Sequence, residues 1–219
     1  MKLFIKLAAT FLTAVVVAVA VGYFYWYKPK FRASVINPSF GYKYKEPDNK
    51  YILSRLQTKA SEIIKYAITH HYNTNHCFLV DMNISSGKKR FFVYDLKKNS
   101  IEDAGLVAHG CGSDKGEGKL YFSNEINSGC TSLGKYKVGK AYTGRFGLAY
   151  KLYGLDSSNT NAIQRFVVLH AYSYVPYEEV APIGICESRG CPMVAPAFLV
   201  VLKDYIDHAD KPILLWIFY

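Results

Sequence analysis

Acidic residues are scarce in this chain of 219 residues, and none of them precedes Glu46. In all, 17 Asp and Glu stand against 27 Lys and Arg. Five of the basic residues lie before position 33, so the remainder of the chain has 22 basic and 17 acidic residues, an excess of +5. Since no basic run is longer than residues 88–90, the charge argues against nucleic acid as a partner and suits an anionic surface or substrate.

Internal repeats and low-complexity tracts are absent as well. The composition, half apolar and 20% charged, excludes disordered, collagen-like and coiled-coil chains. A chain of this length can form one domain with a well-developed core. The 19 Tyr and 13 Phe favour strands, because flat aromatic side chains pack well on a pleated surface.

The longest stretch without a charge runs from Leu7 to Tyr27. A helix of this length would span about 30 Å, the thickness of the hydrocarbon core of a membrane. An aromatic belt at 23–27 followed by three basic residues favours a retained anchor, while Ala18–Ala20 would suit cleavage of a signal peptide. We therefore assign residues 1–32 to a membrane anchor or signal segment, with its orientation left open by basic residues on both sides.

Residues 33–76 are predicted to form a linker and a packing helix. The stretch 28–50 contains three prolines and no helical or alternating period, which is typical of a linker. After a cap at Asp48 or Asn49, apolar residues then recur at intervals of three and four, which predicts an amphipathic helix that packs on the domain. This apolar stripe consists of Ile52, Leu56, Ala60, Ile63 and Ala67.

Residues 77–219 are predicted to form a mostly β domain of the α+β class, a curved sandwich or open barrel with packed helices. Short runs rich in Val, Phe and Tyr alternate with clusters of Gly, Ser, Asn and Asp, which is typical of strands joined by turns. A helix is expected over 195–208 and a closing strand over 213–219. The other predicted strands are 77–84, 90–96, 105–108, 135–138, 148–153 and 166–170.

One of the five cysteines, Cys191, lies in a tight turn just ahead of the predicted helix 195–208. The neighbouring Arg189 and a helix start would both favour a thiolate. Gly190 would let a substrate approach the backbone, and the amides of Gly190 and Cys191 could stabilise an oxyanion, since Pro192 has no N–H. A buried or disulfide-bonded cysteine is the alternative interpretation.

His170 ends a predicted strand 21 positions before Cys191. Strand, loop and turn can fold back over this distance and bring an imidazole to a thiol, the pair that cysteine acyl transfer requires. His109 is the rival base. Glu187 beside Cys186 would raise the pKa of that thiol and oppose its reactivity.

With these residues identified, the chain from about Cys77 to Tyr219 resembles the murein L,D-transpeptidase family, in the branch whose signature ends in Ser-x-Gly-Cys-Pro. Six blocks occur in the order and approximate spacing of the family, which makes the resemblance specific. They are Val107–Gly110, Phe122–Asn124, Thr131–Tyr136, the Tyr-x-Gly-Arg-x-Gly pattern at 142–147, Arg165–His170 followed by Tyr174-Val175, and Ser188–Pro192.

The resemblance implies Cys191 as nucleophile and His170 as general base, with Ser188, Arg189 and Gly190 completing the active-site turn. Many relatives outside this branch have a histidine at the position of Arg189. The family has Gly or Ser where this chain has Ala171, so the group that orients the imidazole is a backbone carbonyl or is absent. The resemblance also offers Ser123, Asn124, Tyr142 and Arg145 as residues that shape the substrate groove, although packing and turn roles would explain them equally well.

The implied activity is peptidoglycan L,D-transpeptidation, a cysteine-dependent acyl transfer on tetrapeptide stems in the cell envelope, on the periplasmic side. Stem peptides and, through the N-terminal segment, the cytoplasmic membrane are the expected partners, and no cofactor, metal or nucleic acid is expected. The alternatives are an L,D-carboxypeptidase acting on the same bond, a catalytically silent wall-binding module, and a generic cysteine peptidase. A thiolate metal site built from His109, Cys111, His170, Cys186 and Cys191 is disfavoured, because their spacings match no CxxC pattern.

Overall fold

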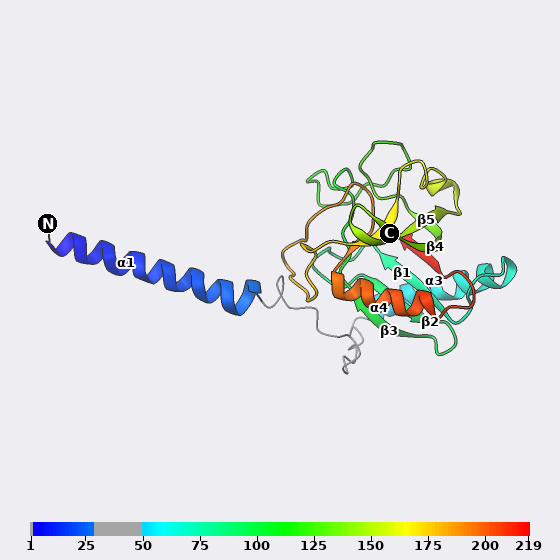
Figure 1. Ribbon diagram of the computed structural model, residues 1–219, viewed down its shortest axis with the longest axis horizontal. Coiled ribbons are helices and arrows are strands. Elements are labelled where there is room, and N and C mark those ends of the chain that lie inside the picture. The colour runs from blue at the N-terminus through cyan, green and yellow to red at the C-terminus, as the bar shows by residue number, and fades with distance from the viewer. Residues whose placement is uncertain (1, 29–49) are drawn as a thin grey trace.

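The computed structural model describes residues 2–28 and 50–219 (Figure 1). Most of the predicted linker, with the caps at Asp48 and Asn49, lies outside the described residues. The N-terminal segment is helical: α1 spans Lys2–Val21 and continues as a π-helical stretch, η1, over Gly22–Tyr27. Residues Lys6–Tyr27 of this helix are long and apolar enough to cross a membrane, and none of them is buried in the protein. The segment could therefore be a membrane anchor or a signal.

The strands form one eight-stranded sheet in the order β3-β2-β1-β8-β4-β5-β6-β7. Neighbouring strands are antiparallel except in the pairs β1–β8 and β6–β7, which are parallel. The strands are β1 His76–Asp81, β2 Phe91–Asp95, β3 Ser100–Gly105, β4 Gly134–Gly144, β5 Gly147–Gly154, β6 Val168–Ala171, β7 Met193–Val194 and β8 Leu214–Phe218. A short 3-10 helix, η2, covers Ser157–Asn159.

Helix α3, Lys50–Thr69, covers one face of the sheet over β1 and β8. Four members of the predicted stripe are fully buried, which confirms the amphipathic helix: Leu56, Ala60, Ile63 and Ala67. They pack against inward-facing side chains of the sheet such as Leu79, Phe92, Leu214 and Phe218. Burial of these apolar side chains holds the helix on the sheet.

Helix α4, Pro196–Asp207, belongs to the core on the opposite face of the sheet. Phe198, Leu199 and Leu202 of α4 are buried together with Tyr150 and Leu169 of β5 and β6. Within the described ranges, the sheet therefore has one long α-helix on each face.

The two edges of the sheet are joined through the segment that follows β3. Val107 bridges Val194 of β7, and the Ala108 N–H donates to the Met193 carbonyl at 2.9 Å. Because β3 and β7 are the outer strands, these contacts roll the sheet toward an open barrel. The mostly β, α+β class predicted from the sequence is thus confirmed.

Several of the predicted strands differ from the structure: 77–84 ends at Asp81, and 135–138 extends over Gly134–Gly144. The predicted strand 105–108 is not a regular strand: β3 ends at Gly105, and of the residues after it only Val107 forms a β-bridge. Phe166 lies outside β6 with a φ of +54°, so it does not share a strand face with His170. An L residue with positive φ breaks the extended backbone that the alternation assumes.

Candidate functional site

The turn Ser188–Pro192 is held by hydrogen bonds to the segment 109–111. The Ser188 N–H and Oγ–H both donate to the His109 carbonyl, at 2.8 and 3.2 Å, and the Cys111 N–H donates to the Ser188 carbonyl at 2.7 Å. Inside the turn, the Gly190 N–H donates to Ser188 Oγ at 3.0 Å. Ser188 therefore fixes the backbone that leads into Cys191.

Glycine is required at position 190 for two reasons. Its φ is +107°, a conformation that L side chains rarely adopt. A Cβ at this position would also lie 2.6 Å from the Cys130 carbonyl oxygen. Any other residue would move the turn and the adjacent Cys191.

The Cys191 thiol lies against the beginning of β6. Its Sγ is 3.5 Å from the Val168 nitrogen, which donates to it, and 3.6 Å from the Phe166 carbonyl oxygen. Burial raises the pKa of the Cys191 thiol, while the Val168 N–H and the positive charge of Arg165 act in the opposite direction. In this environment the thiol needs a base to ionise at neutral pH.

The expected activation of Cys191 by Arg189 and a helix start is wrong in its details. Arg189 is exposed, and the cation that acts on the thiol is Arg165. Strand β7 separates Cys191 from the first turn of α4, so the N-terminus of that helix is not at the sulfur. The Gly190 amide is already engaged by Ser188, whereas the Cys191 N–H has no acceptor among the described residues and is the available oxyanion donor.

His170 is buried in β6, two residues beyond the strand position that holds the sulfur. Its Nδ1 is 3.0 Å from the Ala171 carbonyl oxygen. Because a carbonyl only accepts, Nδ1 carries the proton and Nε2 is free to act as a base. Burial lowers the pKa of His170, which keeps the ring neutral at pH 7. Of the two options for the orienting group, the structure has the backbone carbonyl.

Backbone contacts hold the segment that follows Cys191 next to β6, the strand of His170. His170 pairs with Met193, and its N–H points to the Pro192 carbonyl oxygen at 3.5 Å. Val168 and His170 share one strand face, since side chains alternate, and two residues along a strand cover about 6.6 Å. The Cys191 sulfur thus lies against β6 two residues before His170, and within the described part of the chain no hydrogen bond joins it to the imidazole.

Arg165 is a site residue that the sequence reasoning did not single out. Its guanidinium donates to the carbonyl oxygens of Ser123 and Cys130 and to the hydroxyls of Ser128 and Ser132. It therefore joins the loop 123–132 to the strand that carries His170, and its charge acts on Cys191. The available signal was its position at the start of the Arg165–His170 block.

Ser123 and Asn124 are used in loop contacts. The Ser123 Oγ accepts from the Glu125 N–H at 3.1 Å, which closes a local turn. The Asn124 side chain donates to Thr160 and accepts from the Asn161 N–H, at 2.9 and 3.1 Å. These bonds fix the loop 123–132 against the segment after η2, and a substrate-binding role for the two residues stays a prediction.

Tyr142 and Arg145 lie in the β4–β5 hairpin next to His170. Tyr142 pairs with Ala149, and Ala149 pairs with His170, so the three residues form one row across the sheet. Arg145 lies over the Phe146 ring at 5.7 Å, and Phe146 stacks on the His170 ring with centroids 4.6 Å apart and an interplanar angle of 16°. Phe146 occupies an unspecified position of the motif at 142–147, which is why the sequence did not indicate it.

His109, the rival base, is directed away from this pair. Arg90 Nη2 donates to its Nδ1 at 2.9 Å, so Nε2 carries the proton and faces Glu187 Oε1 at 3.5 Å. Burial, followed by the charge of Arg90, lowers the pKa of His109 to about 4. Its ring is therefore neutral, its buried Nε2 has no hydrogen-bond partner among the described residues, and its carbonyl accepts from Ser188.

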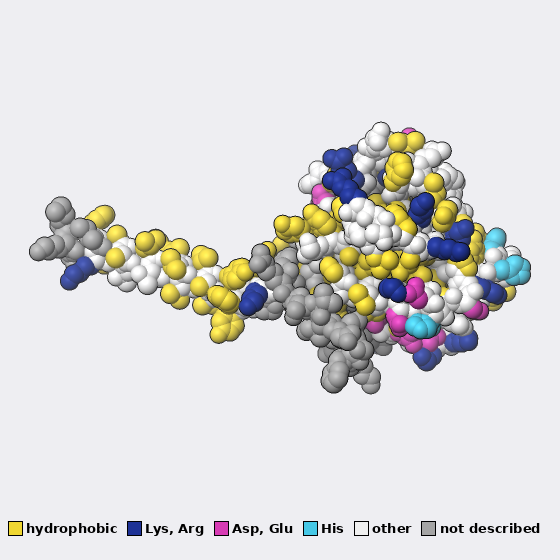
Figure 2. All heavy atoms as spheres, in the orientation of Figure 1, with side chains coloured by type: hydrophobic (Ala, Val, Ile, Leu, Met, Phe, Trp, Pro, Cys, Tyr) yellow, Lys and Arg dark blue, Asp and Glu magenta, His cyan; other side chains and the backbone are white. Residues whose placement is uncertain are grey.

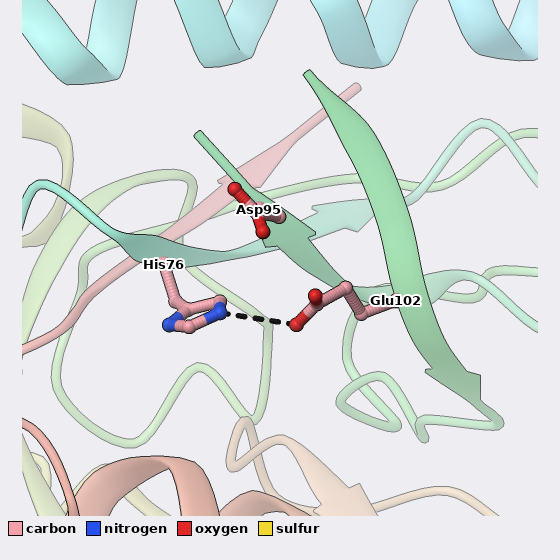
Figure 3. Close-up of side chains that lie close together, drawn as sticks. All are labelled: His76, Asp95 and Glu102. Atoms are coloured by element: carbon pink, nitrogen blue, oxygen red, sulfur yellow. Dashed lines mark hydrogen bonds and ion pairs between the residues drawn. The ribbon is translucent and has the colours of Figure 1, made fainter. Parts of the chain in front are cut away.

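Two groups of potential metal ligands come together within the described residues, and neither contains a cysteine. The first group consists of His109, Asp114 and Glu187. The Arg90 guanidinium donates to Nδ1 of His109, whereas a histidine that binds a metal through Nε2 needs a hydrogen-bond acceptor at Nδ1. In the second, Figure 3 shows His76 and Glu102 turned toward each other, with an Nε2–Oε2 distance of 3.0 Å.

The carboxylates of that second group, Asp95 and Glu102, are also paired with the ammonium of Lys98, at 3.0 and 2.8 Å. It is an ion-pair network across three strands. Both groups are thus explained without a metal by the residues around them.

All five cysteines lie in the described ranges and are free thiols. Cys77 is fully buried in the core. Burial, and not Glu187 as expected, raises the pKa of Cys186, because the Glu187 carboxylate faces His109. No disulfide joins Cys186 to Cys191.

The chain resembles several solved structures at low sequence identity. An L,D-transpeptidase of Xylanimonas cellulosilytica is 12% identical, with a TM-score of 0.39 over 70% of this chain and 68% of that chain. The helical cell shape determining protein Pgp2 of Campylobacter jejuni is 12% identical, with a TM-score of 0.40 over 75% and 54%. An L,D-transpeptidase of Mycobacterium tuberculosis H37Rv is 13% identical, with a TM-score of 0.33 over 66% and 58%. This chain therefore spans little more than half the length of the last two proteins.

Among curated protein sequences, no match to the chain is found. The family model of the L,D-transpeptidase catalytic domain, by contrast, matches residues 48–216, which include α3 and nearly the whole sheet. The match covers well over half of the sequence and all six blocks that carried the resemblance. The chain belongs to the L,D-transpeptidase catalytic-domain family, whose members act on peptidoglycan.

Proposed function

We propose that this protein is a cysteine-dependent peptidoglycan L,D-transpeptidase with Cys191 as nucleophile and His170 as general base. The observation that carries the proposal is the position of the Cys191 sulfur on the strand of His170, whose Nδ1–H is fixed by the Ala171 carbonyl. This tautomer leaves Nε2 able to take the thiol proton. Membership of the family supplies the substrate class, the stem peptides of peptidoglycan.

The first half-reaction acylates the enzyme. His170 Nε2 takes the proton from Cys191, and the sulfur attacks the carbonyl on the L-centre side of an L,D bond in a tetrapeptide stem. In this proposal the Cys191 N–H, which has no acceptor among the described residues, donates to the oxyanion of the tetrahedral intermediate. The C–N bond then breaks, and the proton on His170 passes to the departing D-amino acid, which leaves as an amine.

The second half-reaction releases the acyl group from sulfur. An amine of a second stem attacks the thioester after His170 removes its proton, and the thiol is restored as the crosslink forms. Water in place of the amine would make the protein an L,D-carboxypeptidase. The two reactions share every residue named here, so the acceptor decides between them.

This function requires the catalytic domain in the cell envelope, on the periplasmic side of the cytoplasmic membrane. The apolar helix Lys6–Tyr27 supports such a location, either as an anchor or as a signal. A reporter fused after Tyr219 should be active outside the cytoplasm. Activity confined to the cytoplasm would contradict the proposed location.

Incubation of the protein with a disaccharide tetrapeptide, followed by mass analysis of the products, tests the function. A crosslinked dimer is expected and would identify a transpeptidase. Tripeptide alone would identify the carboxypeptidase, and unchanged substrate with intact Cys191 would indicate a silent wall-binding module.

A further inference from the structure

A groove of about 700 Å³ runs along β4, next to the end of α4. Strand β8 pairs with β4 over Gly134–Lys137, and the Val138 N–H donates to the Ile213 carbonyl at 3.0 Å, so the edge of β4 is open only beyond Val138. The strand side of the groove is formed by β4 and β5, and its other side by the last turn of α4 and the loop 209–213. In Figure 2, basic side chains gather over the region where Figure 1 labels β4 and β5.

Four lysines line this groove: Lys137, Lys140, Lys151 and Lys211. None of the four has an ion pair with a carboxylate of the described residues. Of the two aspartates of the lining, Asp207 pairs with Lys203, whereas Asp210 accepts from the neutral Asn73 amide and keeps its charge, so the lysines outnumber the aspartates by two. The groove therefore has an excess of positive charge that its own residues do not neutralise.

Two tyrosines support these ammonium groups. Lys137 lies over the Tyr153 ring at 4.4 Å, and Lys151 lies over the Tyr142 ring at 5.8 Å. Lysines on an open edge would by themselves be explained by protection against edge pairing. Lys137 and Lys151, however, project from the face of the sheet and lie over tyrosine rings. From this position they do not block pairing at the edge.

The strand register connects this groove to the site around Cys191. Lys151 pairs with Val168, whose N–H donates to the Cys191 sulfur, and Tyr142 lies in the row of His170. Paired residues on one sheet face have Cβ atoms about 5 Å apart. One extended peptide residue spans about 3.3 Å. The Lys151 ammonium can thus reach a group one or two residues from a carbonyl bound at the sulfur.

We propose that the lysine groove binds the carboxylate-bearing end of the stem peptide, with Lys151 recognising the free carboxylate of the D-amino acid that departs. This proposal rests on the proposed function, because it names the part of the substrate that the groove holds. Lys151 is in this account a specificity-determining residue. It selects stems that end in a free carboxylate over stems whose end is blocked.

Binding to the full chain with Cys191→Ala tests the proposal without turnover. The probes are a disaccharide tetrapeptide with a free C-terminal carboxylate and the same compound with a C-terminal amide. For the free acid, Lys151→Gln should raise Kd about fivefold, the worth of one exposed charge-assisted hydrogen bond. Lys151→Arg should retain most of the affinity. Lys65→Gln, which removes an equally exposed lysine on α3, should have no effect.

The amide should bind about fivefold more weakly than the acid to the chain with Lys151, and Lys151→Gln should abolish this difference. Equal Kd values for acid and amide, or equal effects of Lys151→Gln and Lys65→Gln, would overturn the proposal.

Carbapenem labelling of the chain that retains Cys191 separates this failure from failure of the proposed function. If the carbapenem forms an adduct but the Kd of the free acid is the same with and without Lys151, only the groove proposal is overturned. If the Kd depends on Lys151 but no adduct forms, the groove proposal stands and the proposed function is overturned. If the Kd does not depend on Lys151 and no adduct forms, both proposals are overturned.

Discussion

The His170 ring is the residue-level centre of the proposed chemistry, and three contacts define its state. The Ala171 carbonyl fixes its tautomer, burial keeps it neutral, and Phe146 covers one face of the ring. Phe146 is half-exposed and lies at the hairpin turn between Gly144 and Gly147. It therefore shields the base from water without belonging to the core.

Replacement of Phe146 with Ala should change the pH profile of Cys191 acylation. Burial favours the neutral imidazole, so the acid limb of the wild-type rate should lie below the ordinary histidine pKa of about 6.5. Removing the ring exposes His170 to water, which raises its pKa and moves the acid limb up toward 6.5. The measurement is the rate of carbapenem adduct formation between pH 5 and 8.

Phe146→Tyr should keep the profile, because a tyrosine ring can stack in the same way. Arg145→Ala is the matched control, since it removes the neighbour over the outer face of Phe146 and leaves the stacked ring. An acid limb at the same pH in Phe146→Ala and the wild type would contradict the role given to this ring.

At the level of elements, the attachment of α3 to the sheet includes one buried charge. The Arg55 guanidinium binds the Asp81 carboxylate of β1 through two hydrogen bonds, at 2.8 and 2.9 Å. Asp81 is fully buried, whereas Arg55 is partly exposed. The pair therefore joins helix and sheet at a point where the carboxylate has little access to water.

Arg55→Ala should lower the free energy of unfolding by about 2 kcal/mol, because Asp81 then remains as a buried charge without its cation. Solvent near the exposed side of Arg55 reduces the loss from the larger values typical of fully buried pairs. Lys203→Ala removes an exposed pair with Asp207 within α4 and should cost at most about 0.5 kcal/mol. Denaturant unfolding of the full chain measures both. Equal effects would show that Asp81 does not need Arg55.

The elements that sequence reasoning predicted correctly are those whose burial follows a regular period. The stripe of α3 repeats every three or four residues, and four of its five members are fully buried. Strand β3 was missed because Ser-Ile-Glu-Asp-Ala-Gly is polar, and an outer strand need bury only its last residues. Strand β7 has two residues, too few for any pattern.

In the candidate site, too, sequence reasoning indicated the residues that lie in local motifs and missed those that depend on tertiary contacts. Cys191 and His170 could be proposed because a local motif marks each of them, and the pairing of β6 with β7 agrees with the predicted return of the chain. Arg165 and Phe146 act through contacts that depend on the sheet register, which no local pattern encodes. The orienting carbonyl of Ala171 could be named only as an option, because backbone geometry is not readable from residue identity.

At the level of the whole molecule, buried neutral histidines make the stability depend on pH. Burial and Arg90 lower the pKa of His109 to about 4 in the folded protein, compared with about 6.5 when unfolded. Between these values the unfolded chain binds more protons, so stability falls as the pH decreases from 6.5 toward 4. Above pH 6.5 both states are neutral at this residue and the effect vanishes.

For His109 alone, the free energy of unfolding should be about 2 kcal/mol lower at pH 5 than at pH 7.5. The comparison is made by denaturant unfolding at the two pH values for the wild type and His109→Gln. The variant should lose about 2 kcal/mol less than the wild type over this interval, whatever its stability at pH 7.5. Identical pH dependence of both proteins would show that His109 is protonated equally in the folded and unfolded states.

The central claim is that Cys191 and His170 form one catalytic unit, and carbapenem labelling with mass mapping tests it most directly. The wild type should gain one adduct, on Cys191, since a strained acyl group acylates the activated thiol. Cys191→Ala should gain none, His170→Ala should react much more slowly because the buried thiol loses its base, and Cys186→Ala should still be labelled. An adduct on Cys111, Cys130 or Cys186 with Cys191 unmodified would contradict the account.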